Sequence, residues 1–322
     1  MFRRCDIVIA TWNSVAMTRD ALASVRDQSG FPFRLILVDN SDQEDARASY
    51  REIAASSEYG EIVLIQNEGN IGWLKATNIG IQRADSEYVC LLNNDVICGS
   101  NWLKKCVELI ERESNVALIN PRGNERSEND NVTDINAYAQ HLQKARSQQF
   151  TEMDRCSGYC MFARRQLFDQ LGLLDEIFDG GYFEDFDFSR RVQATGSLCV
   201  QCDDAFVYHL GSQSFKQVPE GPKRAMHDRN RDLCYSRWGR VPRLFVRVCN
   251  PAPNVDELRT LIRKNRVYLL DNKNIPKEIL EFRHGNLEIQ QNSWLWEPLY
   301  FWLRAVHWAR KQKIDEARIL YR

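Results

Sequence analysis

Residues 34–41 read Arg-Leu-Ile-Leu-Val-Asp-Asn-Ser, a run of branched apolar residues that ends abruptly in polar ones. The same change occurs in residues 6–13, Asp-Ile-Val-Ile-Ala-Thr-Trp-Asn. Apolar runs of this length without alternation indicate strands buried on both faces, as in a parallel sheet covered by helices. The runs that predict strands are 6–10, 34–38, 61–65, 88–92 and 116–119.

Helical patterns fill the intervals between these strands. They cover residues 18–28, 42–56, 74–83 and 101–113. Ser41 and Ser100 are the expected N-caps of the second and fourth helix. Strand–helix alternation at this spacing predicts an α/β fold, with a doubly wound, mostly parallel central sheet and helices on both faces.

Polar residues follow four of the predicted strands. They are Thr11-Trp12-Asn13, Asp39-Asn40-Ser41-Asp42, Asn67-Glu68-Gly69-Asn70 and Asn93-Asn94-Asp95. Ligands of such sheets bind beyond the carboxyl ends of the strands, so these residues predict a binding site at that edge. The first strand is not followed by Gly-x-Gly-x-x-Gly, and the sequence has no Gly-Lys-Ser/Thr loop. Both findings argue against dinucleotide binding and P-loop phosphoryl transfer.

Two carboxylates stand out among these strand-end residues. Asp39 could accept hydrogen bonds from a ribose or a uracil-type imide. Asp95 could hold Mg²⁺ or Mn²⁺ against a diphosphate, because both cations prefer oxygen ligands. The alternative for Asp95 is a structural turn, since Asn-Asn-Asp is favourable turn sequence.

Six motifs along the chain together resemble one enzyme family. They are DIVIATWN (6–13), LVDNS (37–41), NEGNIGWLKATNIG (67–80), LLNNDV (91–96), FEDFDF (183–188) and HLGSQS (209–214). Their order and spacing resemble the family 2 glycosyltransferases, and most of all the bacterial rhamnosyltransferase-type branch that builds polysaccharides. The resemblance covers roughly residues 5–215.

The resemblance implies a GT-A fold and inverting transfer of a sugar from a nucleotide-diphosphate sugar donor. The acceptor would be a hydroxyl of a glycan or lipid-linked glycan in cell-surface polysaccharide synthesis. The residues that would contact the donor are Thr11, Asn13, Asp39, Asn70, Lys75, Asn78, Asn93 and Asn94. For Lys75, a solvated helix position is an equal alternative. Trp73 departs from the small residues usual in this part of the family.

The resemblance also implies a metal site and a base. Asn93-Asn94-Asp95 occupies the place of the family's metal-binding Asp-x-Asp, with Asn in place of the first Asp. His209 matches the His that completes the site around Mg²⁺ or Mn²⁺, although it also fits a histidine at the edge of the core. Asp185 would be the catalytic base, with Glu184 and Tyr182 binding the acceptor. The alternative for these acids is a helix start favoured by the macrodipole.

The expected organisation is a catalytic domain at 1–215 followed by a basic, mainly helical extension at 216–322. Within the domain, the nucleotide-sugar half is about 1–120 and the acceptor half about 153–215, with a polar, mobile insertion at 121–152. Net charge is −11 over residues 1–210 and +10 over 211–322. The basic part predicts either an anionic partner, such as a membrane surface or a phosphorylated substrate, or an ordinary solvated surface.

Residues 294–311 concentrate four tryptophans among basic residues. This pattern fits a helix lying on an anionic membrane, and equally a helix packed on the catalytic domain or on a second subunit of a homo-oligomer. No apolar run is long enough for a membrane span or a signal peptide. We therefore expect a cytoplasmic protein, either free or peripheral on the inner face of the cytoplasmic membrane, with no nucleic-acid partner.

The ten cysteines favour reduced thiols over a disulfide framework. Cys199 and Cys202 could suggest zinc, but residues three apart in a strand point to opposite faces.

Two other functions stay open. A sugar nucleotidyltransferase is disfavoured because no Gly-rich activating loop follows the first strand. A non-catalytic nucleotide- or glycan-binding module is disfavoured because Asp95, Asp185 and His209 occur together.

Overall fold

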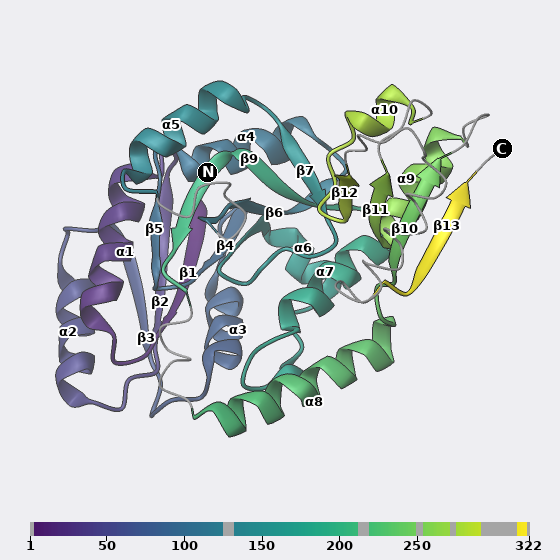
Figure 1. Cartoon of the computed structure of the whole chain (residues 1–322). Helices are drawn as coiled ribbons and strands as arrows, with labels where there is room; N and C mark the ends of the chain where they lie inside the picture. Colours follow the sequence, from purple (N-terminus) through teal and green to yellow (C-terminus); the bar gives the residue numbers. More distant parts are fainter. Residues whose placement is uncertain are drawn as a thin grey trace. The chain divides into compact units, whose positions relative to one another are not determined.

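The structure is a computed structural model of the 322-residue chain. It describes residues 3–124, 132–211, 219–248, 254–270, 275–290 and 314–320. The chain forms two compact units, one made of residues 1–150 and 155–238 and the other of 151–154 and 239–322 (Figure 1).

The first unit is built on a mostly parallel sheet. Its strands run in the order β3 (Ile62–Gln66), β2 (Phe33–Asp39), β1 (Cys5–Thr11), β4 (Tyr88–Leu92), β8 (Cys160–Arg164), β6 (Val116–Arg122), β9 (Leu198–His209) and β5 (Val96–Cys98). The first four strands are parallel, β8 is antiparallel to both neighbours, and β6 and β9 pair in parallel. The five strands expected from the sequence are confirmed with small shifts at their ends.

Helices cover both faces of this sheet. They are α1 (Val15–Gln28), α2 (Glu44–Ala55), α3 (Trp73–Arg83), α4 (Trp102–Arg112), α5 (Ile135–Ala145), α6 (Arg165–Leu171) and α7 (Glu184–Ala194), with a 3₁₀ turn at Glu176–Phe178. A further helix, α8 (Glu220–Trp238), packs against α7. The N-cap expectation was wrong, because α2 and α4 begin after Gln43 and Asn101. Ser41 instead accepts a hydrogen bond from the backbone N–H of Asn13 at 2.9 Å.

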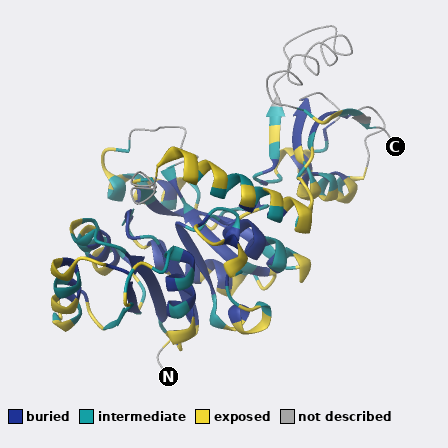
Figure 2. Ribbon diagram, turned by 90° about the horizontal axis from the view of Figure 1, so that it is seen from below, coloured by how far each residue is buried: buried dark blue, intermediate teal, exposed yellow. Residues whose placement is uncertain are grey.

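Successive side chains of β1 point to opposite faces of the sheet, so helices on both faces bury this one strand. Ile7 and Ile9 belong to the core cluster that includes Leu22 of α1 and Leu103 of α4. Val8 points to the other face, where a Cβ added at Gly80 of α3 would lie 2.2 Å from its side chain. Figure 2 shows the result, with buried strands between helices whose outer faces are exposed. The fold class expected from the sequence is therefore confirmed.

The stretch expected to be a mobile insertion contains regular structure. Residues 135–145 form α5, and its Ala139 and Leu142 are buried in a cluster with Phe206 of β9. Three-residue spacing places these two apolar residues on one helix face, so the helix packs although the segment is polar overall. Residues 125–131 lie outside the described ranges.

The boundary expected near residue 215 needs correction, because α8 belongs to the first unit. Asp187 of α7 is completely buried and accepts hydrogen bonds from Arg237 at 2.7 Å and from the Trp238 indole at 2.8 Å. These two hydrogen bonds to a buried carboxylate fix the end of α8 against α7.

The second unit contains a parallel sheet where mainly helices were expected. Its strands run in the order β12 (Leu287–Gln290), β11 (Arg266–Leu270), β10 (Arg243–Val248) and β13 (Glu316–Leu320), with α9 (Val255–Lys264) and α10 (Lys277–Leu280). Residues on the two faces of β10 and β11 enter separate buried clusters, which explains why these basic segments form strands. From β7 (Phe150–Met153), Glu152 pairs with Arg263 through two contacts of 2.8 Å.

Two of the expectations concern membranes, and the described residues bear on one of them. None of the helices in the described ranges combines the length and apolar character needed to cross a bilayer. The tryptophan-rich segment 294–311 lies outside the described residues. Its contact with a membrane or a second subunit therefore stays a prediction.

A buried ion pair at the start of β1 offers a test of this fold. Asp6 is fully buried and accepts two hydrogen bonds of 2.8 Å from Arg34, besides others from Ser86. Burial by itself raises the pKa of Asp6, but the hydrogen bonds from Arg34 and Ser86 outweigh it and lower the pKa below its usual range. This stabilisation is therefore present near neutral pH and is lost as the pH falls through the lowered pKa.

We expect Asp6→Asn to cost about 3 kcal/mol, because it leaves the buried Arg34 guanidinium without its main anion. The melting temperature measured at pH 7 should fall by roughly 6–12 °C for a unit of this size. Asp27→Asn is the matched control, since the Arg26–Asp27 pair is half exposed and should change little. Equal effects of the two substitutions would contradict the assignment.

Candidate active site

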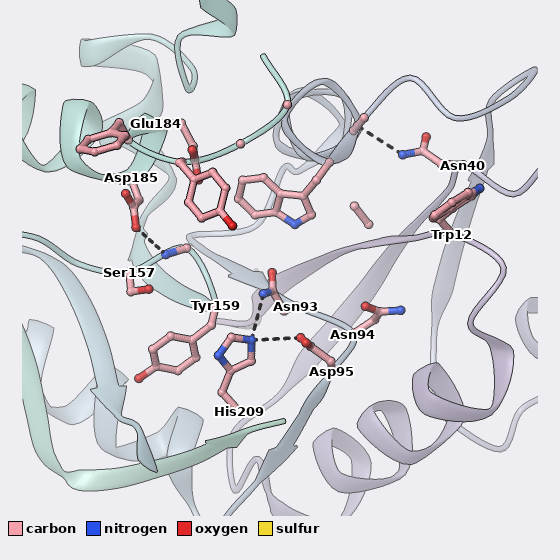
Figure 3. A pocket seen from close by; sticks show the side chains of 18 of the residues that line it. Trp12, Asn40, Asn93, Asn94, Asp95, Ser157, Tyr159, Glu184, Asp185 and His209 are labelled. Carbon is pink, nitrogen blue, oxygen red and sulfur yellow. Dashed lines mark hydrogen bonds and ion pairs between the residues drawn. The ribbon is translucent and has the colours of Figure 1, made fainter. Parts of the chain in front are cut away.

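A cavity of about 450 Å³ opens at the carboxyl edge of the central sheet. Its lining comes from the ends of β1 and β4, the loop before α3, the segment before β8, the turn before α7, the end of β9, and α8 (Figure 3). This is the edge at which the sequence predicted a binding site, and it is where ligands of open α/β sheets bind.

Four of the eight predicted donor-binding residues border this cavity. They are Thr11, Asn70, Asn93 and Asn94. Asn70 closes the loop before α3, because its side chain accepts a hydrogen bond from the backbone N–H of Gly72 at 2.9 Å. Asn94 donates to Thr18 of α1 at 3.1 Å, which fixes the end of β4 against that helix.

The other four predicted donor-binding residues, all of them described, do not line the cavity. Asp39 is fully buried, and its carboxylate accepts hydrogen bonds from the Ser41 N–H and the Gln66 amide, both at 2.8 Å. Asn78 is buried against Leu174, whose backbone it contacts through both atoms of its amide. Lys75 is half-buried on α3.

Asn13 also lies beside the cavity rather than in its lining. Its amide donates to Asp42 at 2.5 Å, and its backbone has a φ of 50°. The left-handed conformation, which Asn tolerates better than most residues, turns the chain away after β1. The sequence therefore predicted the correct edge of the sheet but not which strand-end side chains face inward. Asn40 and Trp12 do face the cavity and were not singled out.

Asp95 and His209 meet in the cavity because β5 pairs with β9. Their ladder places Val96 opposite His209, and Leu210 donates its N–H to the Asp95 carbonyl at 2.8 Å. As a result the Asp95 carboxylate lies 3.2 Å from the Nε2 atom of His209 (Figure 3). The imidazole also stacks on Tyr159, with ring centroids 5.3 Å apart.

This pair fits the ligand set of a divalent cation. Two ligands about 2.1 Å from one cation at right angles lie about 3 Å apart, close to the observed separation. Asn93 Oδ1 is buried beside them and accepts no hydrogen bond from the residues that the structure describes. Within the same residues, no group of three His, Cys, Asp or Glu side chains could hold a metal. A cation here would therefore need ligands from a diphosphate or water.

Glu184 and Asp185 enter the cavity from the first turn of α7. Asp185 accepts hydrogen bonds from the N–H groups of Gly158 at 3.2 Å and Phe186 at 2.7 Å, and Arg155 lies 3.9 Å away. Glu184 is almost completely buried. Burial and the neighbouring Asp185 charge raise the pKa of Glu184 to about 8.

The turn that delivers these carboxylates has an unusual backbone. Residues 180–183 all have positive φ, and two of them are aromatic, Tyr182 at 68° and Phe183 at 75°. A bulky residue in this region is strained, so the conformation persists only where the surroundings hold it. Strain of this kind is typical of functional sites. Tyr182, which was predicted to bind the acceptor, lines the cavity.

Helix α8 supplies the contacts that hold the turn. Asn230 is fully buried, and its amide donates to backbone carbonyls of the turn, at 2.7 Å to Gly181 and 3.2 Å to Phe178. His227 packs edge-on against Tyr182 and Phe183, with centroids 5.2 and 5.3 Å away. A Cβ at Gly180 would lie 2.0 Å from the Met226 sulfur, so glycine is also needed for close approach.

Several lining residues were missed from the sequence. Arg155, Tyr159, Phe183 and His227 border the cavity. Trp73, which the sequence analysis noted, also borders it. Phe183 is the first residue of the motif at 183–188, so its position was a usable signal. His227 had no such signal in the sequence, because α8 was assigned to a separate extension.

Comparison with known proteins identifies the family. The model of Glycosyl transferase family 2 matches residues 6–172, slightly more than half of the chain. The chain belongs to this family. The family expected from the six motifs is confirmed, while the rhamnosyltransferase-type branch stays a prediction.

Curated relatives of this glycosyltransferase include two polysaccharide synthases. Chondroitin synthase of Escherichia coli is 24% identical over 237 residues, which make up 63% of this chain and 34% of that protein. Hyaluronan synthase of Pasteurella multocida is 22% identical over 237 residues, 63% of this chain and 24% of that protein. The chain thus spans about a quarter to a third of the length of these relatives.

Solved structures show the same GT-A fold. A mannosyltransferase from Pyrobaculum calidifontis in complex with GDP-Man and Mn²⁺ superposes with a TM-score of 0.54 at 16% identity, covering 75% of this chain and 67% of that one. GalNAc-T7 with UDP, GalNAc and Mn²⁺ gives 0.52 at 16% identity, covering 64% and 44%. The glycosyltransferase fold expected from the sequence is therefore confirmed.

The role of α8 can be tested at Asn230. We expect Asn230→Ala to lower the free energy of unfolding by about 1–3 kcal/mol, because buried carbonyls lose their donor. Amide hydrogen exchange of residues 181–187 should become faster. Asp232→Ala, an exposed substitution on the same helix, is the control and should leave that exchange unchanged. If exchange in the turn stays the same in Asn230→Ala, its amide does not hold the turn.

Proposed function

We propose that this glycosyltransferase is an inverting enzyme that transfers a sugar from a nucleotide-diphosphate sugar to a glycan or lipid-linked glycan hydroxyl. The observation that carries the proposal is that Asp95 with His209, and Asp185 with Glu184, border one cavity. Inverting transfer needs these two functions on opposite sides of a bound sugar, one at the leaving diphosphate and one at the incoming hydroxyl.

The donor would bind over the ends of β1 and β4. Thr11, Asn40 and Asn70 offer hydrogen-bonding groups to the nucleoside and phosphates at this rim. Asp39 would act indirectly, by fixing the backbone of Ser41. One solved structure of the same fold contains UDP and another GDP-Man, which supports a nucleotide sugar as the donor class here.

Asp95 and His209 would hold Mg²⁺ or Mn²⁺ together with the diphosphate. Two solved structures of the same fold contain Mn²⁺, which favours this cation. When bound, such an ion supplies Lewis-acid stabilisation of the charge that develops on the leaving diphosphate. With two charged or imidazole ligands among the described residues, cation and nucleotide should bind cooperatively.

Asp185 would take the proton of the attacking hydroxyl. Two backbone N–H groups fix its carboxylate, and the strained turn before α7 sets the direction in which it enters the cavity. A positioned base of this kind contributes roughly 10²–10⁴-fold to the rate. Its geometry therefore explains why the chain maintains a strained backbone there.

The first experiment is a thermal-shift screen of nucleotide sugars, including UDP-GlcNAc and GDP-Man, with and without Mn²⁺. A ligand that binds the folded state raises the melting temperature. We expect one nucleotide class to do so only with the cation, and to release nucleoside diphosphate slowly. Release of pyrophosphate would instead favour a nucleotidyltransferase, and binding without any turnover a non-catalytic module.

For Asp185→Asn we expect unchanged donor binding and a loss of transfer of at least 100-fold, because the amide cannot accept the proton. Donor binding is measured by the thermal shift and transfer by release of nucleoside diphosphate. Asp179→Asn, in the same loop but outside the cavity lining, is the control. Near-normal turnover by Asp185→Asn would reject the base assignment.

For Asp95→Asn we expect the Mn²⁺-dependent part of the thermal shift with UDP or GDP to disappear, since a neutral amide is a weaker ligand than a carboxylate. Asp45→Asn on the exposed start of α2 should keep the full shift. A Mn²⁺-dependent shift that survives Asp95→Asn would place the cation elsewhere.

A further inference from the structure

Glu184 is a buried carboxyl group in the cavity, and the proposed reaction gives it no part in proton transfer or cation binding. Only 6% of the residue is exposed, and its Oε2 atom is buried with no hydrogen-bond partner among the residues that the structure describes. Its other oxygen lies near the Gly158 backbone, and Trp73 approaches the same place. A buried polar atom without a partner is costly, so the side chain is poised for a ligand.

The charged and titratable groups around Glu184 do not stabilise an anion there. On its own helix, the nearest group is the Asp185 carboxylate, which is a like charge. From the segment before β8, Arg155 favours the anion only weakly and approaches Asp185, at 3.9 Å. From α8, His227 faces the same cavity and packs against Tyr182 and Phe183.

Two backbone donors of this rim serve Asp185. The N–H groups of Gly158 and Phe186 both donate to Asp185, whereas Glu184 Oε2 has no such donor among the described residues. Two adjacent carboxyl groups in a water-poor site share one proton more readily than they both ionise. The raised pKa of Glu184, about 8 through burial first and then the Asp185 charge, agrees with this geometry.

We propose that Glu184 stands in the cavity as a neutral carboxylic acid and donates a hydrogen bond to an oxygen of the acceptor sugar. The oxygen would lie on the ring carbon next to the hydroxyl that Asp185 deprotonates. This inference rests on the proposed function for the role of Asp185, and it adds a requirement for the substrate. The acceptor class is a sugar with oxygen atoms on two neighbouring carbons, such as a vicinal diol.

The requirement follows from the positions of the two acids. Glu184 and Asp185 are consecutive residues whose side chains both reach the cavity from the first turn of α7. In the proposed arrangement, a sugar that presents one hydroxyl to Asp185 would present the neighbouring oxygen to Glu184. A neutral carboxyl group can donate there, whereas an ionised one can only accept.

The protonation state is measured directly by ¹³C NMR of the full chain with labelled glutamate side chains. The Glu184 resonance is the one that Glu184→Gln removes. We expect its titration midpoint near pH 8, and a midpoint below pH 7 would contradict the proposal.

In addition, Glu184→Gln should raise the melting temperature by several degrees more at pH 9 than at pH 5. The sign follows because a raised carboxyl pKa destabilises the folded state as pH rises through it.

The donated hydrogen bond is tested by saturation-transfer NMR with methyl glycosides of glucose, galactose, mannose and N-acetylglucosamine, in the presence of Mn²⁺ and UDP. We expect at least one glycoside to bind the wild type at pH 7. The same glycoside should bind the Glu184→Gln variant at both pH 7 and pH 9. Binding should weaken at least fivefold in Glu184→Ala, and in the wild type at pH 9. Gln preserves a donor of similar size, so it separates hydrogen bonding from packing.

Glycoside binding that survives in Glu184→Ala would overturn the proposal, and so would a wild type that binds none of the four probes. Neither result depends on turnover. The proposed transfer reaction fails by a different observation, namely the absence of nucleotide-sugar binding and nucleoside diphosphate release. The two failures can therefore be told apart.

Discussion

The turn that brings Glu184 and Asp185 into the cavity depends on one buried amide. Asn230 of α8 donates to carbonyl oxygens of the turn before α7, and this turn has positive φ at four consecutive residues. Tyr182 and Phe183 are strained in this conformation, so the turn needs an external partner to persist. Because α7 begins at Glu184, the direction in which Glu184 and Asp185 enter the cavity follows from that contact.

The opposite side of the cavity is built differently, by strand pairing. Asp95 and His209 are far apart in the sequence, and the antiparallel ladder between β5 and β9 brings them within 3.2 Å. A ladder leaves little freedom, which suits a pair of metal ligands. Asp185 has its own backbone donors, while Glu184 has an oxygen with none among the described residues. The two neighbouring carboxyl groups thus have different surroundings, and burial raises the pKa of Glu184.

Sequence patterns predicted five strands of the first unit well, because each of these five is a short apolar run that ends in polar residues. They could not decide which polar residues face the ligand. Asp39 and Asn78 look like ligand-binding residues but satisfy the backbone of Ser41 and Leu174. The role of α8 was also hidden, because its link to the turn is a tertiary contact of Asn230 and leaves no periodic signal. In the second unit, short runs such as 243–248 are too brief for periodicity to separate a strand from a helix.

The central claim is that one cavity holds a cation at Asp95 and the acceptor at Asp185. A crystal structure of the full chain with Mn²⁺ and either UDP or GDP tests it most directly. The account predicts Mn²⁺ coordinated by the Asp95 carboxylate, the His209 Nε2 atom and the diphosphate, with Asp185 facing the diphosphate across an open space of sugar size. Electron density for the nucleotide or the cation outside this cavity would contradict it.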